Sequence, residues 1–545
     1  MSEYNESIAY FCMEYGLDEK LPLYAGGLGV LAGDLLKAAK DKNAPVVGIG
    51  IRWWQDYTTQ YINEEGKPYD TFPTFELDFL EDTGIEVKVK IENNLVPCKV
   101  YKVTIFDNAP LYLLDTGHPG TEYGWITDKL YHGNKRDRIA QEIVLGIGGI
   151  KLLRELDITI DKYHFNEGHA AFAGFELIRE KMDRKNINFE EALNKTRKEI
   201  VFTTHTPVPA GNESHDLDLL FKMKANFGLN HEQLKQIGGD PFNMTAACLH
   251  MSTITNGVSQ QHEETAKKMW ANLDNSSPII SITNGIHQTT WQNERIKKAF
   301  VNNYGLWEEH MKLKKSLVEY IEDNTGTKMN SKKIIIGFAR RAAPYKRSEL
   351  IFRENKQIDN FLKNSTIQLV FSGKAHPDDH YGKEIVAKLV QMDRKYKNSV
   401  VFLENYNMEI ARFLAQGCDV WLNNPRRPLE ASGTSGMKAA INGVLNLSVL
   451  DGWIAEGIEH GKTGWILDNL FPDLEDSLGE DEKDLQALYQ IIREDVIPIY
   501  YHDHKKWVQM MYDSINMASK QFTASRMLDD YYHKMYSKIL NPAKI

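Results

Sequence analysis

The sequence predicts an α/β protein with two doubly wound domains, each a mostly parallel sheet covered by helices. Three observations lead to this prediction. The chain has 545 residues, too many for one hydrophobic core. An apolar run at 8–13, a glycine loop, a helix from 28 to about 40 and a strand at 46–51 follow one another in the order of a doubly wound sheet. A second series of apolar strands begins at residue 333.

We expect the division into domains 1–285 and 286–545, because the pattern changes near residue 286 to charged helices before strands resume. The net charge of −10 argues against broad binding to nucleic acid or to anionic membranes. The four cysteines lack zinc-type spacing, which indicates reduced thiols in a cytoplasmic protein. No basic leader and no apolar run of roughly 20 residues are present, so neither export nor membrane insertion is expected.

In the first domain, the GGLG run at 26–29 lies between a strand and a helix. Glycine there allows either close packing of the helix or close approach of the backbone to a phosphate, and the sequence leaves both explanations open. Gly27 is the candidate contact. From residue 58 to 114, alternating segments predict strands and hairpins without obvious chemistry.

Several polar side chains in the first domain follow predicted strands. His164, Glu167 and His169 resemble a metal site, but the two histidines are five apart rather than four and no third ligand is evident. We therefore expect no metal, and instead a polar cluster that contacts substrate or closes a hydrogen-bond network. His205 ends a strand and Asn284 lies in an Asn-Gly turn. Either residue could contact substrate or have a structural role only.

In the second domain, a dense cationic group follows the buried strand that begins at 333. It consists of Arg340, Arg341, Lys346 and Arg347. In a domain of acidic overall balance, such a group favours an anion site over a solvated helix face.

The segment from Glu430 to Lys438, EASGTSGMK, leads from a strand through small and hydroxylated residues into a helix. Free amides at a helix start favour a phosphate, and glycine lets the backbone approach it. Lys438, within about one turn, is placed to neutralise a phosphate or to form a Schiff base with a cofactor aldehyde. A glycine-rich surface loop with a solvated lysine is the alternative.

Eight motifs between residues 8 and 465 resemble those of the α-glucan (glycogen, starch and maltodextrin) phosphorylases, in the same order, and particularly those of their short microbial branch. The motifs are AYFCMEYGL, YAGGLGVLAGD, HFNEGHAAF, TTHTPVPAG, ITNGI, FARRAAPYKR, ENY and EASGTSGMKAAINGVLNLSVLDG. The resemblance implies a GT-B fold, in which two Rossmann-like domains face a central active-site cleft and the C-terminal helix crosses back to the first domain.

The resemblance also assigns site residues. It implies pyridoxal 5′-phosphate attached to Lys438, Tyr406 against the cofactor ring, and phosphate contacts from Thr434 and Ser435. It assigns inorganic phosphate to Arg341 and Lys346 and to the backbone amide of Gly27. The positions that match those holding the reacting glucosyl unit are His205, Asn284, Glu430, Ser432 and Gly433.

The sequence departs from the large animal enzymes of this family in three respects. Arg340 stands where they have a lysine near the cofactor phosphate, and Ala25 stands where they have an asparagine. Their long regulatory N-terminal extension has no counterpart, so their regulation is not expected here.

The resemblance implies a retaining glycosyltransferase, an α-glucan phosphorylase that interconverts α-1,4-glucan plus inorganic phosphate with glucose 1-phosphate. The cofactor's 5′-phosphate would take part rather than its aldehyde, and a homodimer is common in the family. Three alternatives remain: a nucleotide-sugar glucosyltransferase similar to glycogen synthase, a non-catalytic glucan-binding protein, and a pyridoxal enzyme acting on amino acids. Lys438 argues against the first and the retained Arg341, Lys346 and Lys438 against the second. The third lacks an identifiable acidic partner for the pyridine nitrogen.

Overall fold

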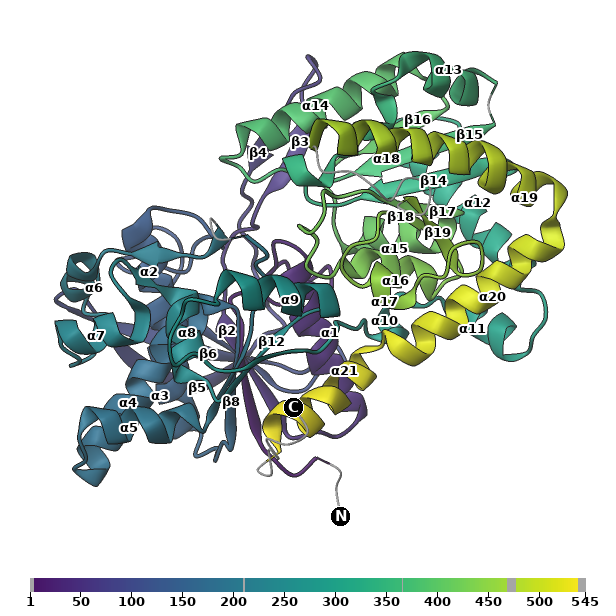
Figure 1. Cartoon of the computed structure of the whole chain (residues 1–545). Helices are drawn as coiled ribbons and strands as arrows, with labels where there is room; N and C mark the ends of the chain where they lie inside the picture. Colours follow the sequence, from purple (N-terminus) through teal and green to yellow (C-terminus); the bar gives the residue numbers. More distant parts are fainter. Residues whose placement is uncertain (1–3, 209–210, 365, 468–476, 538–545) are drawn as a thin grey trace. The chain divides into compact units, whose positions relative to one another are not determined.

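The structure, a computed structural model, describes residues 4–208, 211–364, 366–467 and 477–537 (Figure 1). The described residues divide into two compact units. Unit 1 takes those of Met1–Tyr57, Phe72–Asn284 and Ala524–Ile545, and unit 2 those of Thr58–Thr71 and Gly285–Thr523. In the described part of the chain, no helix combines the length and apolar character needed to cross a membrane.

Unit 1 is built on a nine-stranded sheet in the order β13-β12-β9-β8-β1-β2-β7-β6-β5. Its parallel strands are β1 (Ile8–Phe11), β2 (Val46–Ile51), β7 (Leu111–Asp115), β8 (Lys162–Asn166), β9 (Ile200–Thr203), β12 (Ile254–Gly257) and β13 (Ile279–Ser281). The antiparallel strands β5 (Glu81–Ile91) and β6 (Asn94–Val103) extend one edge. The order of the parallel strands reverses between β1 and β8, so ligands of this sheet are expected beyond the carboxyl ends of these two strands.

The central strands of unit 1 are buried because helices cover both faces of the sheet. Every residue of β1, β8 and β9 is buried. The helices of the unit are α1 (Gly27–Asp41), α2 (Lys135–Ile143), α3 (Gly149–Glu155), α4 (Ala171–Lys185), α5 (Phe189–Arg197), α6 (Leu217–Met223), α7 (His231–Gly238), α8 (Met244–Met251), α9 (Gln260–Met269) and α21 (Ala524–Tyr531). A π-helical turn at Val144–Gly148 joins α2 to α3, so residues 135–155 form one continuous helical segment.

The end of the described chain packs on the sheet of unit 1. His164, in the middle of β8, bonds through Nδ1 to the Tyr536 hydroxyl at 2.6 Å and through Nε2 to Thr203 Oγ1 at 2.7 Å. Burial lowers the pKa of His164 to about 3, so the ring is neutral. His164, one of the three residues that resembled a metal site, therefore has a structural role, because it binds the C-terminal segment to the sheet.

Replacing Tyr536 with phenylalanine should lower the stability of unit 1 by about 1–3 kcal/mol. The change keeps the aromatic packing but leaves a buried ring nitrogen of His164 without its partner. Differential scanning calorimetry would measure the shift. Tyr304→Phe is the matched control, because Tyr304 is 84% exposed and should tolerate the change. Equal stability of the two variants would contradict the expectation.

Unit 2 contains a six-stranded, fully parallel sheet in the order β16-β15-β14-β17-β18-β19. The strands are β14 (Ile334–Ala339), β15 (Ile367–Ser372), β16 (Val400–Leu403), β17 (Val420–Asn423), β18 (Leu445–Ser448) and β19 (Gly464–Ile466). Numbered along the chain, this is the Rossmann order 3-2-1-4-5-6, which reverses between β14 and β17. The carboxyl ends of these two strands are therefore where a ligand of unit 2 is expected.

Helices cover both faces of this second sheet as well. They are α10 (Gln288–Trp291), α11 (Glu294–Val301), α12 (Leu306–Thr325), α13 (Asn355–Lys363), α14 (His380–Lys395), α15 (Met408–Gly417), α16 (Thr434–Ala440), α17 (Ile454–Gly457), α18 (Ser477–Ile491), α19 (Ile497–His502) and α20 (His504–Gln521). The described cysteines of both units are free and buried, in agreement with the expectation of reduced thiols.

A hairpin from the N-terminal part of the chain belongs to unit 2, which the sequence did not indicate. Its strands are β3 (Thr59–Ile62) and β4 (Pro68–Thr71). Gln60 exchanges hydrogen bonds with the backbone of Ala375, and Asp70 pairs with Lys383. These contacts attach the hairpin to the loop that follows β15 and to α14.

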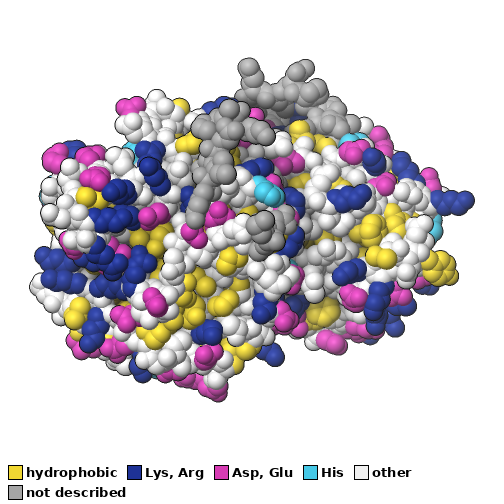
Figure 2. Space-filling view, turned by 90° about the horizontal axis from the view of Figure 1, so that it is seen from below, with side chains coloured by type: hydrophobic (Ala, Val, Ile, Leu, Met, Phe, Trp, Pro, Cys, Tyr) yellow, Lys and Arg dark blue, Asp and Glu magenta, His cyan; other side chains and the backbone are white. Residues whose placement is uncertain are grey.

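Figure 2 shows one face of the molecule, on which cationic and anionic side chains are interspersed. Basic side chains gather at the left of this view, with acidic side chains near them. This mixed distribution agrees with the composition, which argues against broad binding to a polyanion.

Candidate active site

The carboxyl edge of the unit 2 sheet carries a buried cationic group at the point where the strand order reverses. Arg340 directly follows β14, and Glu430 lies in the loop after β17. Arg340 Nη2 and Lys346 Nζ lie 2.8 and 2.5 Å from the same oxygen, Glu430 Oε2. Burial alone would raise the pKa of Glu430, but the two cations outweigh it and lower the pKa to about 2. Glu430 is therefore ionised, and the three side chains carry one net positive charge.

The four cations that the sequence grouped together have different environments. Arg340 and Lys346 are buried and form ion pairs with Glu430, whereas Arg341 is exposed. Arg347 is 1% exposed and binds the carbonyls of Asn424 and Pro425 and two carboxylates of α18. The structure thus brings Lys346 and Arg340 together but leaves Arg341 outside this group, and it uses Arg347 to hold the loop after β17.

Lys438 lies on α16, and its ammonium group lies 3.6 Å from the centre of the Trp291 ring. Asn442 fixes this arrangement, because its side-chain amide donates to the carbonyls of both Trp291 (2.9 Å) and Lys438 (2.8 Å). Both side chains are buried. Trp291 was not predicted from the sequence. The available signal was a tryptophan seven residues after Asn284 of the ITNGI motif.

The loop before α16 is held in a conformation that glycine permits. Gly433 has φ 87°, in the left-handed region. Gly452 has φ 58°, and a Cβ there would lie 2.4 Å from the Ser432 carbonyl oxygen. Asp451 accepts from the backbone amides of Glu430 (2.8 Å) and Gly452 (2.9 Å). The loop that carries Glu430 and Ser432 is therefore fixed by a buried carboxylate.

Several polar atoms at this edge are buried without a hydrogen-bond partner among the described residues. They include Arg340 Nη1, Ser432 Oγ and the side-chain oxygens of Asn423 and Asn424. A buried donor without a partner costs about 1–3 kcal/mol, which a bound ligand can recover.

Tyr406 and Ser435 are further predicted cofactor contacts. Tyr406 lies in the loop after β16, where the charge of Arg340 lowers the pKa of its hydroxyl. Burial has the larger effect and raises the pKa of Tyr406 to about 12. Ser435 accepts a hydrogen bond from the Trp421 indole at 3.3 Å.

Asp451 should give the protein a characteristic pH dependence. Its burial, together with the charge of Glu430, raises its pKa to about 7. The unfolded carboxyl titrates near pH 3.8, so from about pH 4 to 7 only the unfolded state has lost this proton. The contribution of Asp451 to stability is therefore full below pH 4 and falls as the pH rises to 7. Relative to wild type, an Asp451→Asn protein should gain stability between pH 5 and 7, measured by urea unfolding. A difference independent of pH would contradict the assignment.

In unit 1, the glycine loop lies between β1 and α1. Glu14 Oε2 accepts from the amides of Ala25 (2.7 Å) and Gly26 (3.1 Å), and the Tyr131 hydroxyl donates to Oε1 at 2.8 Å. A buried carboxylate thus sets the path of the backbone into the helix that begins at Gly27.

The structure separates the two explanations of these glycines. A Cβ on Gly29 would lie 2.7 Å from Glu14 Oε2, and one on Gly33 would lie 2.2 Å from the Gly16 carbonyl, so packing requires both. A Cβ on Gly26 or Gly27 would meet nothing within 4 Å. Packing within the described chain therefore does not account for Gly26 and Gly27.

His205 follows β9 and is held by the two residues at the end of β8. Its ring Nε2 lies 2.6 Å from Asn166 Oδ1, and its backbone amide donates to Glu167 at 2.6 Å. Burial lowers the pKa of His205 to about 3. Asn284 is buried, and its side-chain oxygen has no hydrogen-bond partner in the part of the chain that the structure describes. Both residues therefore present polar groups suited to hydroxyl ligands.

One acidic group in unit 1 was not singled out from the sequence. The ligand atoms of Glu142, Glu213 and His215 lie within 4.8 Å of one another. Arg138 lies 2.8 Å from Glu213 and 3.9 Å from Glu142, and His215 lies 3.1 Å from Glu142. Protein cations therefore already compensate these carboxylates.

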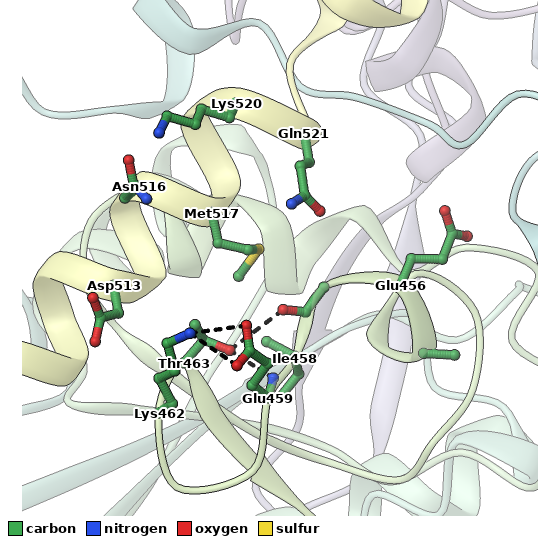
Figure 3. A pocket seen from close by; sticks show the side chains of 12 residues that line it. Glu456, Ile458, Glu459, Lys462, Thr463, Asp513, Asn516, Met517, Lys520 and Gln521 are labelled. Carbon is green, nitrogen blue, oxygen red and sulfur yellow. Dashed lines mark hydrogen bonds and ion pairs between the residues drawn. The ribbon is translucent and has the colours of Figure 1, made fainter.

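A groove elsewhere in unit 2 has a volume of about 320 Å³ (Figure 3). It lies between α17, the following loop and α20, and Lys462 and Glu459 form an ion pair within it. None of the residues that the sequence predicts for the site lines this groove.

Comparisons with known proteins agree with this geometry. A family model described as carbohydrate phosphorylase matches residues 294–464. A maltodextrin phosphorylase of Thermococcus litoralis is 38% identical, over 99% of this chain and 71% of that protein. A glycogen phosphorylase of Aquifex aeolicus is 33% identical, over 98% of this chain and 87% of its own length. An uncharacterized protein of Methanocaldococcus jannaschii is 35% identical, over 97% of this chain and 99% of that protein.

Two Rossmann-like sheets, with a buried cationic group at the switch point of the second, define a doubly wound α/β protein with a positively charged group at the strand ends of unit 2. The chain belongs to the carbohydrate phosphorylase family. The predicted α/β class with two Rossmann-like sheets, as in the GT-B fold, and the predicted family are thereby confirmed.

Proposed function

We propose that this protein is an α-glucan phosphorylase, which transfers a glucosyl unit with retention between an α-1,4-glucan and inorganic phosphate to form glucose 1-phosphate. The observation that carries this proposal is the buried group of Arg340, Lys346 and Glu430 at the switch point of unit 2. It offers a net positive charge and, at Arg340 Nη1, a donor without a partner among the described residues. The names of the relatives from Thermococcus litoralis and Aquifex aeolicus agree with it.

The residues of unit 2 fit pyridoxal 5′-phosphate, which we propose as the cofactor. Lys438 would bind its aldehyde carbon, with Trp291 and Tyr406 beside the ring. Thr434 and Ser435 would bind its phosphate, together with Arg340, whose free donor supports this assignment. When bound, the cofactor supplies a phosphate that exchanges a proton with the substrate phosphate.

In this proposal, the cations of unit 2 stabilise two phosphates that lie near each other. Two unit negative charges about 5 Å apart repel by roughly 3 kcal/mol at an effective dielectric constant of 20. Lys346 and Arg340 would offset this repulsion, and Arg341, which is exposed, would add a further positive charge. Glu430 keeps the two buried cations paired before substrate binds. Because the carboxylate is ionised, it would accept hydrogen bonds from sugar hydroxyls.

The proposed glucosyl contacts in unit 2 are Glu430, Ser432 and Gly433. Those in unit 1 are His205 and Asn284, whereas the Gly27 amide would contact inorganic phosphate. The open space beside Gly26 and Gly27 supports a ligand that approaches the backbone there. His205 is neutral, so it would bind a hydroxyl rather than act as a cationic acid.

An assay for glucose 1-phosphate, formed from maltodextrin and inorganic phosphate, tests the proposal. A pyridoxal absorption band that borohydride fixes to the protein should accompany this activity. Glucosyl transfer from a nucleotide sugar alone would instead identify a glucosyltransferase. Glucan binding without turnover would identify a non-catalytic protein. Either result, in a protein without the absorption band, would overturn the proposal.

A further inference from the structure

The carboxyl ends of β8 and β9 place three polar residues side by side in unit 1. The strands pair in parallel, with Asn166 opposite Thr203. Glu167 follows β8, and His205 lies two residues after β9. This position is next to the switch point between β1 and β8, where the doubly wound sheet places its ligands.

The backbone and the ring of His205 are bound by two consecutive residues. Glu167 accepts a hydrogen bond from the backbone amide of His205 at 2.6 Å, and Asn166 Oδ1 accepts one from its ring Nε2 at 2.6 Å. Glu167 also accepts a hydrogen bond from the hydroxyl of Thr206 at 3.3 Å. The side-chain amide of Asn166 donates to Cys12 Sγ at 3.2 Å, which orients its oxygen toward His205. The backbone and the ring of His205 therefore cannot move independently of the end of β8.

These contacts also determine the tautomer of His205. An amide oxygen only accepts hydrogen bonds, so Nε2 must carry the proton that it donates to Asn166. In the neutral ring, Nδ1 is then the acceptor. Asn166, the last residue of β8, thus decides which nitrogen of His205 presents a lone pair.

The backbone of Glu167 indicates that its side chain is needed. Its φ of 70° and ψ of 170° lie in a region that is essentially restricted to glycine. The next residue is Gly168, yet the chain has glutamate at the strained position. Strain of this kind persists where the surrounding structure requires a particular side chain, and it concentrates at functional sites.

We propose that Asn166 and Glu167 are positioning residues, which fix the ring orientation and the tautomer of His205 for contact with the reacting sugar. This inference rests on the proposed phosphorylase function. It adds Asn166 and Glu167 as residues that support the contact residue His205. It also explains the strained backbone of Glu167 by the need for its side chain in this support.

The decisive variant is Glu167→Gly, because glycine adopts the observed backbone without strain and removes the side chain with its carboxylate. We expect kcat to fall about 10²-fold, the cost of a misplaced contact group. KM for phosphate should stay within about threefold, because His205 does not bind phosphate in this proposal. The melting temperature should stay within a few degrees, since relief of strain offsets the lost hydrogen bonds. Glu167→Gln, which keeps an acceptor oxygen, should recover part of kcat.

Asp157→Gly is the matched control, because Asp157 also has positive φ (52°) but is exposed. Its kcat should equal that of wild type. If Glu167→Gly keeps kcat within threefold, or if it loses stability or fails to fold while Glu167→Gln remains fully active, the carboxylate has no positioning role and the inference is overturned.

A second measurement does not depend on catalysis. In the ¹⁵N spectrum of the unliganded protein, with the signal assigned by its loss in His205→Gln, His205 should be the Nε2–H tautomer. Asn166→Ala should remove this preference. The opposite tautomer in wild type would refute the inference even in an active phosphorylase. Wild-type protein without phosphorolysis would refute the proposed function while leaving the tautomer result intact.

Discussion

Replacing Lys438 with alanine is expected to abolish covalent binding of pyridoxal phosphate and to lower phosphorolysis by at least about 10³-fold. The buried amine of Lys438 is held beside Trp291 by Asn442, so its position is preset for a planar ring. Alanine removes the anchor, and the cofactor phosphate would no longer be fixed relative to the substrate. Absorption spectroscopy would measure cofactor content, and release of glucose 1-phosphate would measure activity.

The matched control for this prediction is Lys462→Ala. Lys462 is a solvent-exposed lysine of the same unit, and it pairs only with Glu459 among the described residues of the groove in Figure 3. This variant should keep both the cofactor and the activity. Undiminished phosphorolysis by a cofactor-free Lys438→Ala protein would refute the proposed role of Lys438.

The Lys346→Ala protein should lose about 10²-fold in kcat/KM for phosphate, largely through a higher KM. A charge-assisted hydrogen bond contributes roughly 1.5–3 kcal/mol, and the change also removes one of the two cations that hold Glu430. Cofactor content should stay near normal, because Arg340 and Lys438 remain. Steady-state kinetics at varied phosphate, with pyridoxal quantified in parallel, would test both statements.

Arg341→Ala is the comparison that the structure suggests. The family resemblance assigns phosphate to both Arg341 and Lys346, but only Lys346 is buried on Glu430. We therefore expect a smaller loss for Arg341→Ala, because exposed charges are screened by solvent. If Lys346→Ala instead loses the cofactor at unchanged phosphate affinity, the two anion sites have been assigned the wrong way round.

Some site residues could be found only by their contacts. Trp291 lies outside the motifs, and Asp451 lies near the end of the motif that begins at Glu430 without a role assigned to it there. Yet Trp291 contacts Lys438, and Asp451 fixes the loop of Glu430. Glu14 likewise holds the glycine loop from a distance of more than ten residues. Supporting residues of this kind act through the folded backbone, so their spacing in the sequence carries no signal.

By itself, the sequence determined the features that depend on local pattern. Apolar runs, glycine loops and their order predicted two doubly wound sheets, because strand and helix periodicity are properties of neighbouring residues. The motif around Lys438 predicted a loop that leads into a helix, because its residues are contiguous. The role of Lys438 as the cofactor anchor stays a prediction. Only the tertiary structure decided the rest. It attached the hairpin of residues 58–71 to unit 2, buried Arg340 and Lys346 but not Arg341, and explained Gly29 by packing but not Gly27. The physical reason is that burial, charge pairing and steric contact are set by residues distant in sequence, which only the folded chain brings together.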